Sequence, residues 1–428
     1  MMETMNEIDQ KTNTAKTRSN LLAPKLRFKE FNGWWKKTHL KNISEKVNSG
    51  KTPLGGNSVY VPDGILFIRS QNVLDNKLSF ENSTFITNEI NNTMKNSIVK
   101  SNDILLNITG ASLGRSCVVP ENFSIGNVNQ HVCIIRLTKE NNPYFLQPIF
   151  ASEKGQNLFT SLQTGSGREG LNFQSIKKIV LNIPTLPEQQ KIASFLSAVD
   201  EKIQQLTRKK ELLEQYKKGV MQQLFSGELR FKDENGKDYP DWEEKRLGEV
   251  ADFLKGKGIS KLEIDNDGKT ECIRYGQLYT DYKETISKVI SRTSVSTKDL
   301  VLSKANDVII PASGETQIDI ATASCVLRSG IALGGDLNII RTNMSGVFLS
   351  YYLNTHKKFD IARLSQGITV VHLYPSQLGL LKLSIPCLEE QQKIATFLSS
   401  IDTKIESVTY QITQTQTFKK GLLQQLFV

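Results

Sequence analysis

The most regular pattern of hydrophobic positions in the sequence is a four-three spacing that occurs twice. It begins at Ile192 in the first stretch and at Ile394 in the second, and continues for about five heptads in each. Alternating steps of four and three residues place apolar side chains along one stripe of a helix. We therefore predict long helices over residues 186–226 and 388–428. At 1.5 Å per residue each would be roughly 55 to 60 Å long, and would need a partner along its whole length.

The two predicted helices are copies of one another. One opens Leu-Pro-Glu-Gln-Gln-Lys-Ile-Ala at 186–193, the other opens Leu-Glu-Glu-Gln-Gln-Lys-Ile-Ala at 388–395, and both close with Gln-Gln-Leu-Phe. The copies stay in register without a gap, so each helix is the expected partner of the other. Polar residues such as Lys217 and Lys419 interrupt the stripes toward their C-terminal ends. The positions expected at the helix-pair or subunit interface are Ile192, Leu196, Val199, Ile203, Leu206, Leu213, Gly219, Ile394, Leu398, Ile401, Ile405, Val408, Ile412 and Gly421.

Two glycines occupy matching positions inside the predicted helices, Gly219 and Gly421. Glycine inside a helix costs about 1 kcal/mol relative to alanine. We interpret the pair as places of close backbone approach, by the partner helix or by another subunit. The alternative is that both are tolerated helix glycines.

A globular segment precedes each long helix, and both segments start alike. Leu26-Arg-Phe-Lys in the first segment matches Leu229-Arg-Phe-Lys in the second, and a tryptophan follows in each, Trp35 or Trp242. A buried anchoring indole is favoured over a base-stacking one for both tryptophans.

Short β-branched runs recur in the same order inside the two segments and predict matching strands. The loops between them differ almost completely, as in 107–115 against 311–318. A shared frame with divergent loops indicates two similar domains that recognise different things. The matched runs are Phe67-Ile-Arg69 with Cys272-Ile-Arg274, Asn102-Asp-Ile-Leu-Leu106 with Asn306-Asp-Val-Ile-Ile310, and Ile134-Ile-Arg136 with Ile339-Ile-Arg341.

These patterns predict an α+β fold with a pseudo-twofold internal repeat, in which two similar mixed α/β domains alternate with two long helices. The expected boundaries are a disordered tail over 1–24, a first domain over 25–185, a helix over 186–226, a second domain over 227–387 and a helix over 388–428.

Composition narrows the function classes. Hydrophobic residues make up 38% of the chain and no apolar run is long enough for a membrane span. The net charge of +10 favours a polyanionic partner, although many soluble proteins are mildly basic. The polar N-terminal residues lack the apolar core of a signal peptide, so a cytoplasmic protein is expected. Five scattered cysteines support neither a disulfide framework nor a zinc site, and free buried thiols are expected.

A GxGxxG motif spans Gly165 to Gly170. A dinucleotide fingerprint must follow a strand and open a helix, but here a helical pattern precedes the motif and a strand-like stretch follows it. A loop that presents Arg168 to a phosphate or a base edge, or a plain surface loop, fits better.

No motif predicts catalysis or metal binding. Asn141-Asn-Pro-Tyr144 looks slightly like an adenine methyltransferase motif, but it lacks the second proline and reads better as a helix start. The four histidines are isolated and show no metal-ligand spacing. Glu389 and Glu390 at a helix start are interpreted as complementing the helix dipole. The sequence therefore favours a binding protein over an enzyme.

The divergent loops contain the residue types that read DNA bases, arginine for guanine and asparagine or glutamine for adenine. For any single residue the alternative, a solvated loop side chain, is at least as good, whereas for the set DNA contact is favoured. The candidates are Arg69, Gln71, Asn72, Arg115, Asn127, Asn129, Gln130 and Arg168 in the first domain, and Arg274, Tyr275, Gln277, Thr316, Gln317 and His372 in the second.

The chain resembles the specificity subunit of type I restriction-modification systems. The features that carry the resemblance are the duplicated Pro-Glu-Gln-Gln-Lys-Ile helix, the Ile-Pro that precedes each copy and the tryptophan five residues before a leucine. The likeness covers about residues 26 to 428. It implies two target-recognition domains that each read half of a bipartite double-stranded DNA site, separated by an antiparallel helix pair. Because the family's recognition loops do not align between members, it assigns no base-contacting residue.

The resemblance also implies partners. In the family, the helices dock two modification subunits, which bind S-adenosylmethionine and methylate adenine, and restriction subunits that use ATP and Mg²⁺ join the complex. The chain itself would bind no cofactor. Two alternatives stay open: a recognition module of another restriction or methylation class, and a coiled-coil adaptor without a DNA role.

Overall fold

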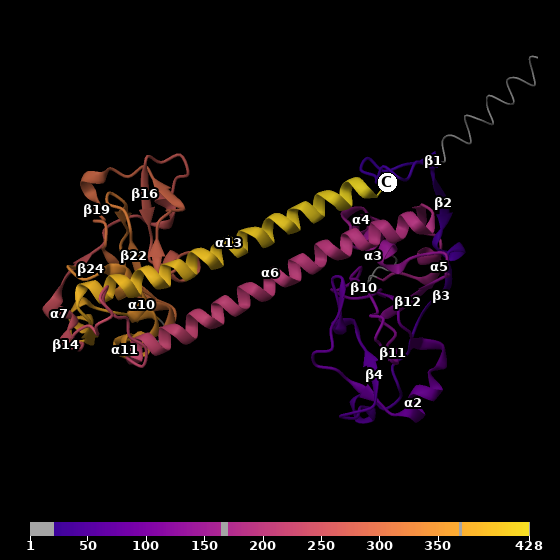
Figure 1. Cartoon of the computed structure of the whole chain (residues 1–428), viewed down its shortest axis with the longest axis horizontal. Helices are drawn as coiled ribbons and strands as arrows, with labels where there is room; N and C mark the ends of the chain where they lie inside the picture. Colours follow the sequence, from indigo (N-terminus) through magenta and orange to yellow (C-terminus); the bar gives the residue numbers. More distant parts are fainter. Residues whose placement is uncertain (1–20, 164–169, 368–369, 428) are drawn as a thin grey trace, which may run out of the picture. The chain divides into compact units, whose positions relative to one another are not determined.

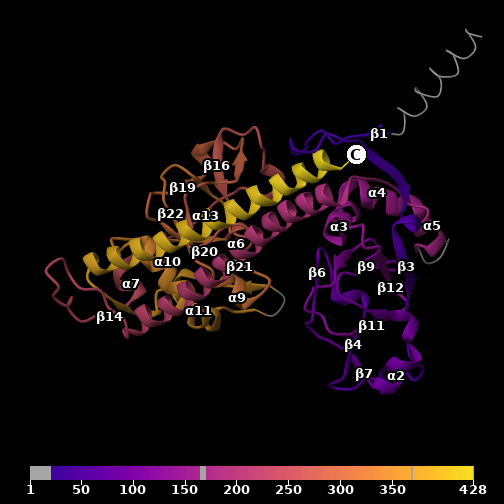
Figure 2. The same ribbon diagram turned by 45° about the vertical axis from the view of Figure 1, so that its right-hand side comes forward.

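The computed structural model describes residues 21–163, 170–367 and 370–427. Figures 1 and 2 trace the chain from two directions. Among the described residues, no helix is long and apolar enough to cross a membrane.

The chain packs into two compact units. The first contains residues 1–207 and 410–428, and the second contains residues 208–409. Each unit therefore holds one globular domain together with one end of each long helix.

The two long helices are α6, Leu186–Ser226, and α13, Leu388–Leu426 (Figure 1). In the first unit, the start of α6 packs with the end of α13, and in the second unit the roles are reversed, so the pair is antiparallel. The predicted fold class is thereby confirmed. Of the expected interface positions, Ile192, Leu196, Leu206, Ile394, Leu398, Ile401, Ile405 and Val408 are buried and Val199, Ile203, Leu213 and Ile412 are half-buried.

The lysines that interrupt the apolar stripes face the partner helix. The Nζ atom of Lys217 lies 2.8 Å from a carboxylate oxygen of Asp402. In the first unit, Lys419 pairs with Asp200 at the matching positions. Each ammonium thus neutralises a carboxylate of the other helix.

The first domain has two four-stranded sheets, ordered β10-β9-β12-β3 and β7-β4-β11-β8, and a three-stranded sheet, β1-β2-β13. Figure 2 shows β3, β9 and β12 side by side. Strands β5 and β6 form a separate pair. The strands are β1 Leu21–Leu22, β2 Trp35–His39, β3 Ser44–Ser49, β4 Ile65–Ile68, β5 Val73–Leu74, β6 Lys77–Leu78, β7 Phe85–Ile86, β8 Ile98–Val99, β9 Ile104–Asn107, β10 Ser116–Val118, β11 Gly126–Val128, β12 Val132–Leu137 and β13 Val180–Ile183; the helices are α2 Asn88–Thr93, α3 Pro143–Ala151, α4 Glu153–Leu162 and α5 Phe173–Lys177.

The second domain repeats this design. Its main sheets are ordered β15-β24-β20-β22-β17 and β18-β16-β23-β19, with the pairs β14-β26 and β21-β25 beside them. The strands are β14 Glu243–Arg246, β15 Ala251–Lys255, β16 Thr270–Ile273, β17 Thr285–Ile286, β18 Ser291–Thr293, β19 Val301–Leu302, β20 Val308–Pro311, β21 Ser313–Gly314, β22 Ser324–Val326, β23 Ala332–Leu333, β24 Leu337–Thr342, β25 Val371–His372 and β26 Lys382–Ile385; the helices are α7 Leu247–Val250, α8 Gln277–Thr280, α9 Gln317–Ile320, α10 Gly346–Thr355, α11 Lys358–Leu364 and α12 Pro375–Leu378.

Strand β1 corrects the expected tail. Residues Leu21 and Leu22 pair with Lys36 and Trp35 of β2, and Pro24 is buried. The last four residues of the stretch expected to be disordered are thus ordered, because the edge of β2 offers backbone partners. The rest of that stretch lies outside the described residues.

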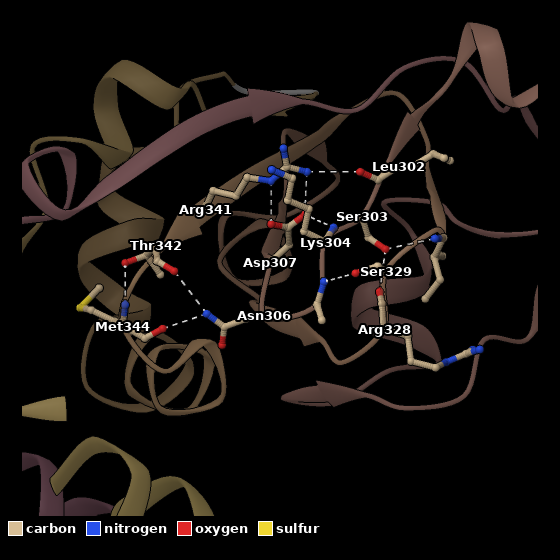
Figure 3. A network of polar contacts seen from close by, with 12 residues as sticks. Leu302, Ser303, Lys304, Asn306, Asp307, Arg328, Ser329, Arg341, Thr342 and Met344 are labelled. Carbon is tan, nitrogen blue, oxygen red and sulfur yellow. Dashed lines mark hydrogen bonds and ion pairs between the residues drawn. The ribbon is translucent and has the colours of Figure 1, made fainter. Parts of the chain in front are cut away.

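The repeated Asn-Asp turn holds a buried ion pair in each domain. Asn306 has a positive φ of 81°, and the next residue, Asp307, is 1% exposed. Figure 3 shows the carboxylate of Asp307 accepting from the guanidinium of Arg341 (2.9 and 3.0 Å) and from the backbone N–H of Lys304 (2.7 Å). Hydrogen bonding to Asp307 raises the pKa of Arg341.

The first domain repeats this arrangement. Asn102 has a φ of 66°, and the guanidinium of Arg136 donates two bonds of 2.7 Å to the buried carboxylate of Asp103. The matched runs are therefore strands, as predicted, and their polar residues join neighbouring strands of one sheet.

The first residues of each long helix form a clasp with the start of the preceding domain. Glu188, 2% exposed, accepts two bonds of 2.7 Å from the guanidinium of Arg27 and one of 3.1 Å from the indole of Trp35. Trp35 is fully buried, so its predicted role as an anchor is confirmed.

Glu390 forms the same clasp in the second unit. Its carboxylate accepts from Arg230 (2.8 Å) and from the indole of Trp242 (3.0 Å), and Glu390 is fully buried. Trp242 is only half-buried, so the buried indole predicted here is confirmed for Trp35 alone. Glu389 and Glu390 both lie in the first turn of α13, as the helix-dipole interpretation expects, and the carboxylate of Glu390 has Arg230 and Trp242 as partners in addition.

The next residue of the duplicated motif fastens another loop. The amide of Gln189 accepts from the backbone N–H of Asn142 (2.9 Å) and donates to the carbonyl of Pro184 (3.0 Å). Gln391 does the same with Ser345 and Pro386, at 2.9 Å each. The Glu-Gln pair in each copy thus serves to join helix and domain.

Candidate nucleic-acid interface

Five connections of the first domain meet at one end of its two main sheets. The N–H of Gly50 donates to the carbonyl of Asn129 (3.2 Å), and the N–H of Asn129 to that of Ile68 (3.1 Å). The N–H of Ile108 donates to the backbone carbonyl of His131 (3.0 Å), and the N–H of Leu171 donates to the carbonyl of Ile108 (2.9 Å). We call this surface loop face 1; it comprises residues 50–56, 69–72, 107–115, 129–131 and 170–171.

The second domain has the same backbone frame. The N–H of Lys257 donates to the carbonyl of Leu333 (3.0 Å), and that of Gly334 to Ile273 (2.9 Å). The N–H of Ala312 donates to the backbone carbonyl of Asp336 (2.7 Å), and the carbonyl of Ala312 accepts from the N–H of Leu373 (3.0 Å). This surface, loop face 2, comprises residues 255–263, 274–277, 311–318, 334–336 and 370–374.

The sequence candidates of the first domain divide by exposure. Gln71, Arg115 and Gln130 are exposed on loop face 1, and Arg69 is half-buried there. The amide of Gln130 accepts from the hydroxyl of Thr52 and contacts the ring of His131 (3.1 Å).

Three asparagine candidates are buried and bonded within the domain, so they cannot meet a ligand as placed. Asn72 accepts from the backbone N–H of Arg69 (3.0 Å) and donates to the carbonyl of Ser79 (3.2 Å). Asn127 donates to the side chain of Asn91 (2.9 Å), and Asn129 accepts from the N–H of His131 (3.0 Å). A buried polar group must find partners inside the fold, and these amides find theirs in the loops they hold.

In the second domain, Thr316, Gln317 and His372 are exposed on loop face 2, and Arg274 and Tyr275 are half-buried. Gln277 accepts from the N–H of Arg274 (2.9 Å) and donates to Ser291 (2.7 Å), so it supports the loop as Asn72 does in the first domain.

The hydroxyl of Thr316 accepts from the N–H of Asp319 (3.1 Å) and caps α9. The ring of His372 stacks on Tyr374 at 6.3 Å, and the ammonium of Lys255 lies 5.7 Å from the Tyr374 ring. Close to Tyr275 and Arg274, burial raises the pKa of the Tyr279 hydroxyl, which therefore stays a neutral donor.

Several exposed residues of the loop faces are not among the candidates that the sequence offers. Lys51 and Lys257 each follow a strand-ending glycine, Gly50 and Gly256. This repeated Gly-Lys after a strand is a pattern that could have identified both lysines. Tyr374 lies two residues after His372, a spacing that puts both on one side of an extended chain.

The two faces differ in charge. In the described part of loop face 1, Lys51, Arg69 and Arg115 are the charged residues and no carboxylate occurs. Loop face 2 combines both signs, because its bases are Lys255, Lys257, Lys261 and Arg274 and its acids are Glu263, Glu315 and Asp336. Both can bind phosphates, and both offer donors and acceptors to base edges.

Of the glycine-rich motif, only the last residue, Gly170, is described, and it belongs to loop face 1. Residues 164–169, and with them Arg168, lie outside the described residues, while Gly170 bridges to Thr109. The described chain runs from α4 before the motif to α5 and then β13 after it, so the expected helical pattern before it is confirmed and a short helix precedes the expected strand.

The described residues contain no cluster of histidine, cysteine, aspartate or glutamate that could hold a metal ion. The side chain of Asn142 caps α3 by accepting from the N–H of Tyr144 (2.8 Å), so the predicted helix start is confirmed. All five cysteines are free, and four are buried.

The exposed sides of the long helices carry a second matched feature. Among the described residues, nothing lies within 4 Å of the place that a Cβ would occupy on Gly219 or Gly421. Close approach by the partner helix is therefore wrong as the reason for these glycines. Tyr216 and Phe418, three residues earlier, are 52% and 54% exposed, so each helix presents an aromatic side chain near a glycine that is exposed in α6 and half-buried in α13.

Comparison with known proteins places these features in a family. The model for the type I restriction modification DNA specificity domain matches residues 32–215 and 239–415. The MjaVIII specificity subunit of a type I restriction enzyme from Methanocaldococcus jannaschii is 27% identical over 77% of this chain and 79% of its own length. The putative MjaX specificity subunit from the same organism is 24% identical over 91% of this chain and 92% of its own. The crystal structure of the S subunit of a type I system from M. genitalium has a similar fold, with a TM-score of 0.59, 16% identity and coverage of 95% of this chain and 99% of that one.

Proposed function

This chain belongs to the type I restriction modification DNA specificity family, and we propose that each of its globular domains reads one half of a bipartite DNA site. The observation that carries the proposal is the pair of loop faces. Similar backbone bonds build both, while the side chains they expose differ. A common frame with different side chains is what two readers of different half-sites require.

Binding to DNA would begin with the phosphates. Lys51 on loop face 1, and Lys257 and Lys261 on loop face 2, are exposed and have no role in the cores. Contacts of this kind release counterions and make the affinity depend on salt.

Sequence reading would then fall to the remaining exposed donors and acceptors. On loop face 1 these are Gln71, Arg115 and Gln130; on loop face 2 they are Gln317 and His372, next to Arg274. Arginine suits guanine, glutamine suits adenine, and the different sets would select different bases.

The helices would set the distance between half-sites and dock two modification subunits. The pairs Tyr216 with Gly219 and Phe418 with Gly421 support docking, because each offers an exposed aromatic side chain next to backbone that a helix of a modification subunit can approach closely. S-adenosylmethionine would be bound by the modification subunits, and ATP and Mg²⁺ would be used by restriction subunits, in the cytoplasm.

Mapping of methylated adenines in the host genome, with the gene intact and deleted, tests the proposal. We expect one bipartite motif to lose methylation on deletion. Exchange of residues 107–115 for the loop of a relative should change only one half of the motif. Unchanged methylation on deletion, together with no salt-sensitive binding to DNA when modification subunits are present, would favour the coiled-coil adaptor.

A further inference from the structure

Two leucines protrude almost completely into solvent. Leu54 on loop face 1 is 97% exposed and Leu262 on loop face 2 is 96% exposed. Among the large hydrophobic side chains of the described residues, the next value is 68%, for Phe359. Single exposed apolar residues are common on protein surfaces, so the argument depends on where these two lie.

Both leucines lie in the same connection of the repeat. Leu54 follows β3 and leads toward β4, and Leu262 follows β15 and leads toward β16. Each connection begins with a glycine packed against opposing backbone. A Cβ on Gly50 would lie 1.6 Å from the carbonyl oxygen of Val128, and a Cβ on Gly256 would lie 1.9 Å from the carbonyl oxygen of Gly334. Only glycine fits at these positions, so both loops leave the sheets at one matching point.

Local contacts hold Leu54 in place. Pro53 before it is buried, and the hydroxyl of Thr52 donates to Gln130. Gly55 after it has a φ of 104°, a conformation that turns the chain sharply and is open to glycine. Leucine at this tip is therefore presented outward by an anchored turn.

Leu262 is held in a different way with the same result. Ile259 anchors the loop, at 3% exposure, and the N–H of Ser260 donates to the side chain of Glu263 (2.7 Å). The hydroxyl of Thr293 donates to the carbonyl of Glu263 (2.7 Å). Leu262 lies inside the short 3₁₀ turn, Lys261–Glu263, that these bonds close.

The surroundings of the leucines favour a polyanion over an apolar protein surface. Lys51 lies three residues before Leu54, and Lys257 and Lys261 precede Leu262; all three are exposed. The acid next to Leu262, Glu263, has its carboxylate engaged by the N–H of Ser260 within the turn. In duplex DNA, phosphates flank an apolar base stack. DNA-binding proteins insert leucine and similar side chains between base steps, mainly from the minor groove, and so unstack and kink the duplex.

We propose that Leu54 and Leu262 are wedges, one for each half-site, that enter the base stack and unstack one step. The inference rests on the proposed function. It assigns to each domain one residue that contributes to recognition by unstacking bases and not by hydrogen bonding to them. The energy of unstacking depends on the step, so a wedge also favours flexible steps at its position.

The test uses the specificity subunit assembled with its modification subunits and duplexes that carry the mapped site. 2-Aminopurine, which brightens on unstacking, replaces one base at a time through each half-site, away from the methylated adenine. We expect one bright step in each half-site. Leu54→Ala should abolish one of these signals and Leu262→Ala the other, each with a loss of affinity on the order of tenfold.

Matched variants separate a wedge from other roles. Leu54→Met and Leu262→Met should keep the signal, and Leu54→Lys should lose it although it adds positive charge. Leu380→Ala, at a leucine 58% exposed elsewhere in the second domain, should change nothing.

Site-specific binding without bright steps, or bright steps and affinity that survive both alanine variants, would overturn the wedges and leave the proposed function standing. Loss of modification-subunit assembly in the alanine variants would assign the leucines to a protein contact and would also overturn them. Failure of the unaltered complex to bind the mapped site would remove both the wedges and the proposed function.

Discussion

Lys217 on α6 and Asp402 on α13 form an ion pair of 2.8 Å across the helix pair, with side chains 13% and 17% exposed. The Lys217 ammonium also lies 3.3 Å from Glu284, and the hydroxyl of Tyr351 donates to Asp402. A lysine in an apolar stripe thus joins α6, α13 and the second domain.

Removal of one member of this ion pair should destabilise the second unit. Lys217→Met leaves two carboxylates without their cation, and we expect a loss of about 1 to 3 kcal/mol in urea denaturation. Lys217→Met combined with Asp402→Leu should recover much of the loss. Lys210→Met, which breaks a more exposed pair with Glu214 on the same helix, should change stability by less than about 0.5 kcal/mol. Equal losses in the two single variants would contradict this assignment.

Each clasp should contribute more to the free energy of unfolding than the surrounding surface charges do. Glu390→Ala leaves the guanidinium of Arg230 and the indole of Trp242 without their shared acceptor, and we expect about 2 to 4 kcal/mol of destabilisation. Glu389→Ala, one residue earlier and exposed, is the control and should be nearly neutral. Similar melting temperatures for the two variants would show that the clasp contributes little.

The helix glycines should respond differently to alanine and to leucine. Gly219→Ala and Gly421→Ala meet no neighbouring atom in the described structure, so each should stabilise the isolated subunit by up to about 1 kcal/mol. Leucine at the same positions should weaken binding of the modification subunit, measured by calorimetry. Gly227→Ala, at a φ of 79°, should instead destabilise the subunit. Unaltered binding by the leucine variants would make both glycines merely tolerated.

Thiol chemistry should depend on burial. Burial raises the pKa of Cys133 from 9.0 to about 12, and does the same for Cys117 and Cys325. At pH 8 we expect fast alkylation of the half-buried Cys387 alone, and none of that fast phase in Cys387→Ser.

The same shift predicts a change of stability at high pH. Above about pH 9 an unfolded thiol releases its proton, while the folded Cys133 keeps it until about pH 12. The folded state binds more protons in this window, so stability falls as the pH rises. Cys133→Ala should show a shallower fall in urea denaturation between pH 9 and 11. Parallel curves for the two proteins would argue against the raised pKa.

Base reading should be separable by domain. Arg115→Ala should relax one base position of one half-site by roughly 1 to 3 kcal/mol of discrimination, and Gln317→Ala should act only on the other half-site. Methylation mapping of each variant measures both effects. Lys51→Ala is the comparison, because a phosphate contact weakens binding to all sequences and reduces its dependence on salt. An equal change in both half-sites for Arg115→Ala would contradict independent readers.

The long helices, their mutual pairing and the two similar domains follow from the sequence alone. Helical periodicity is local, and a repeat that stays in register from Ile192 to Leu224 and from Ile394 to Leu426 leaves little freedom in how each helix is built. The Trp35 anchor and the strand runs around Asn102 and Asn306 were predictable for the same reason, since each depends on a short stretch of chain.

The tertiary structure alone decided which polar residues are free to act. Asn72 and Gln71 are adjacent and chemically alike, yet one is buried against the carbonyl of Ser79 and the other is exposed. Lys217 looked like a break in an apolar stripe until Asp402, far away in sequence, supplied its partner. Burial and pairing depend on what distant segments bring to the same place, and a periodic pattern carries no record of those neighbours.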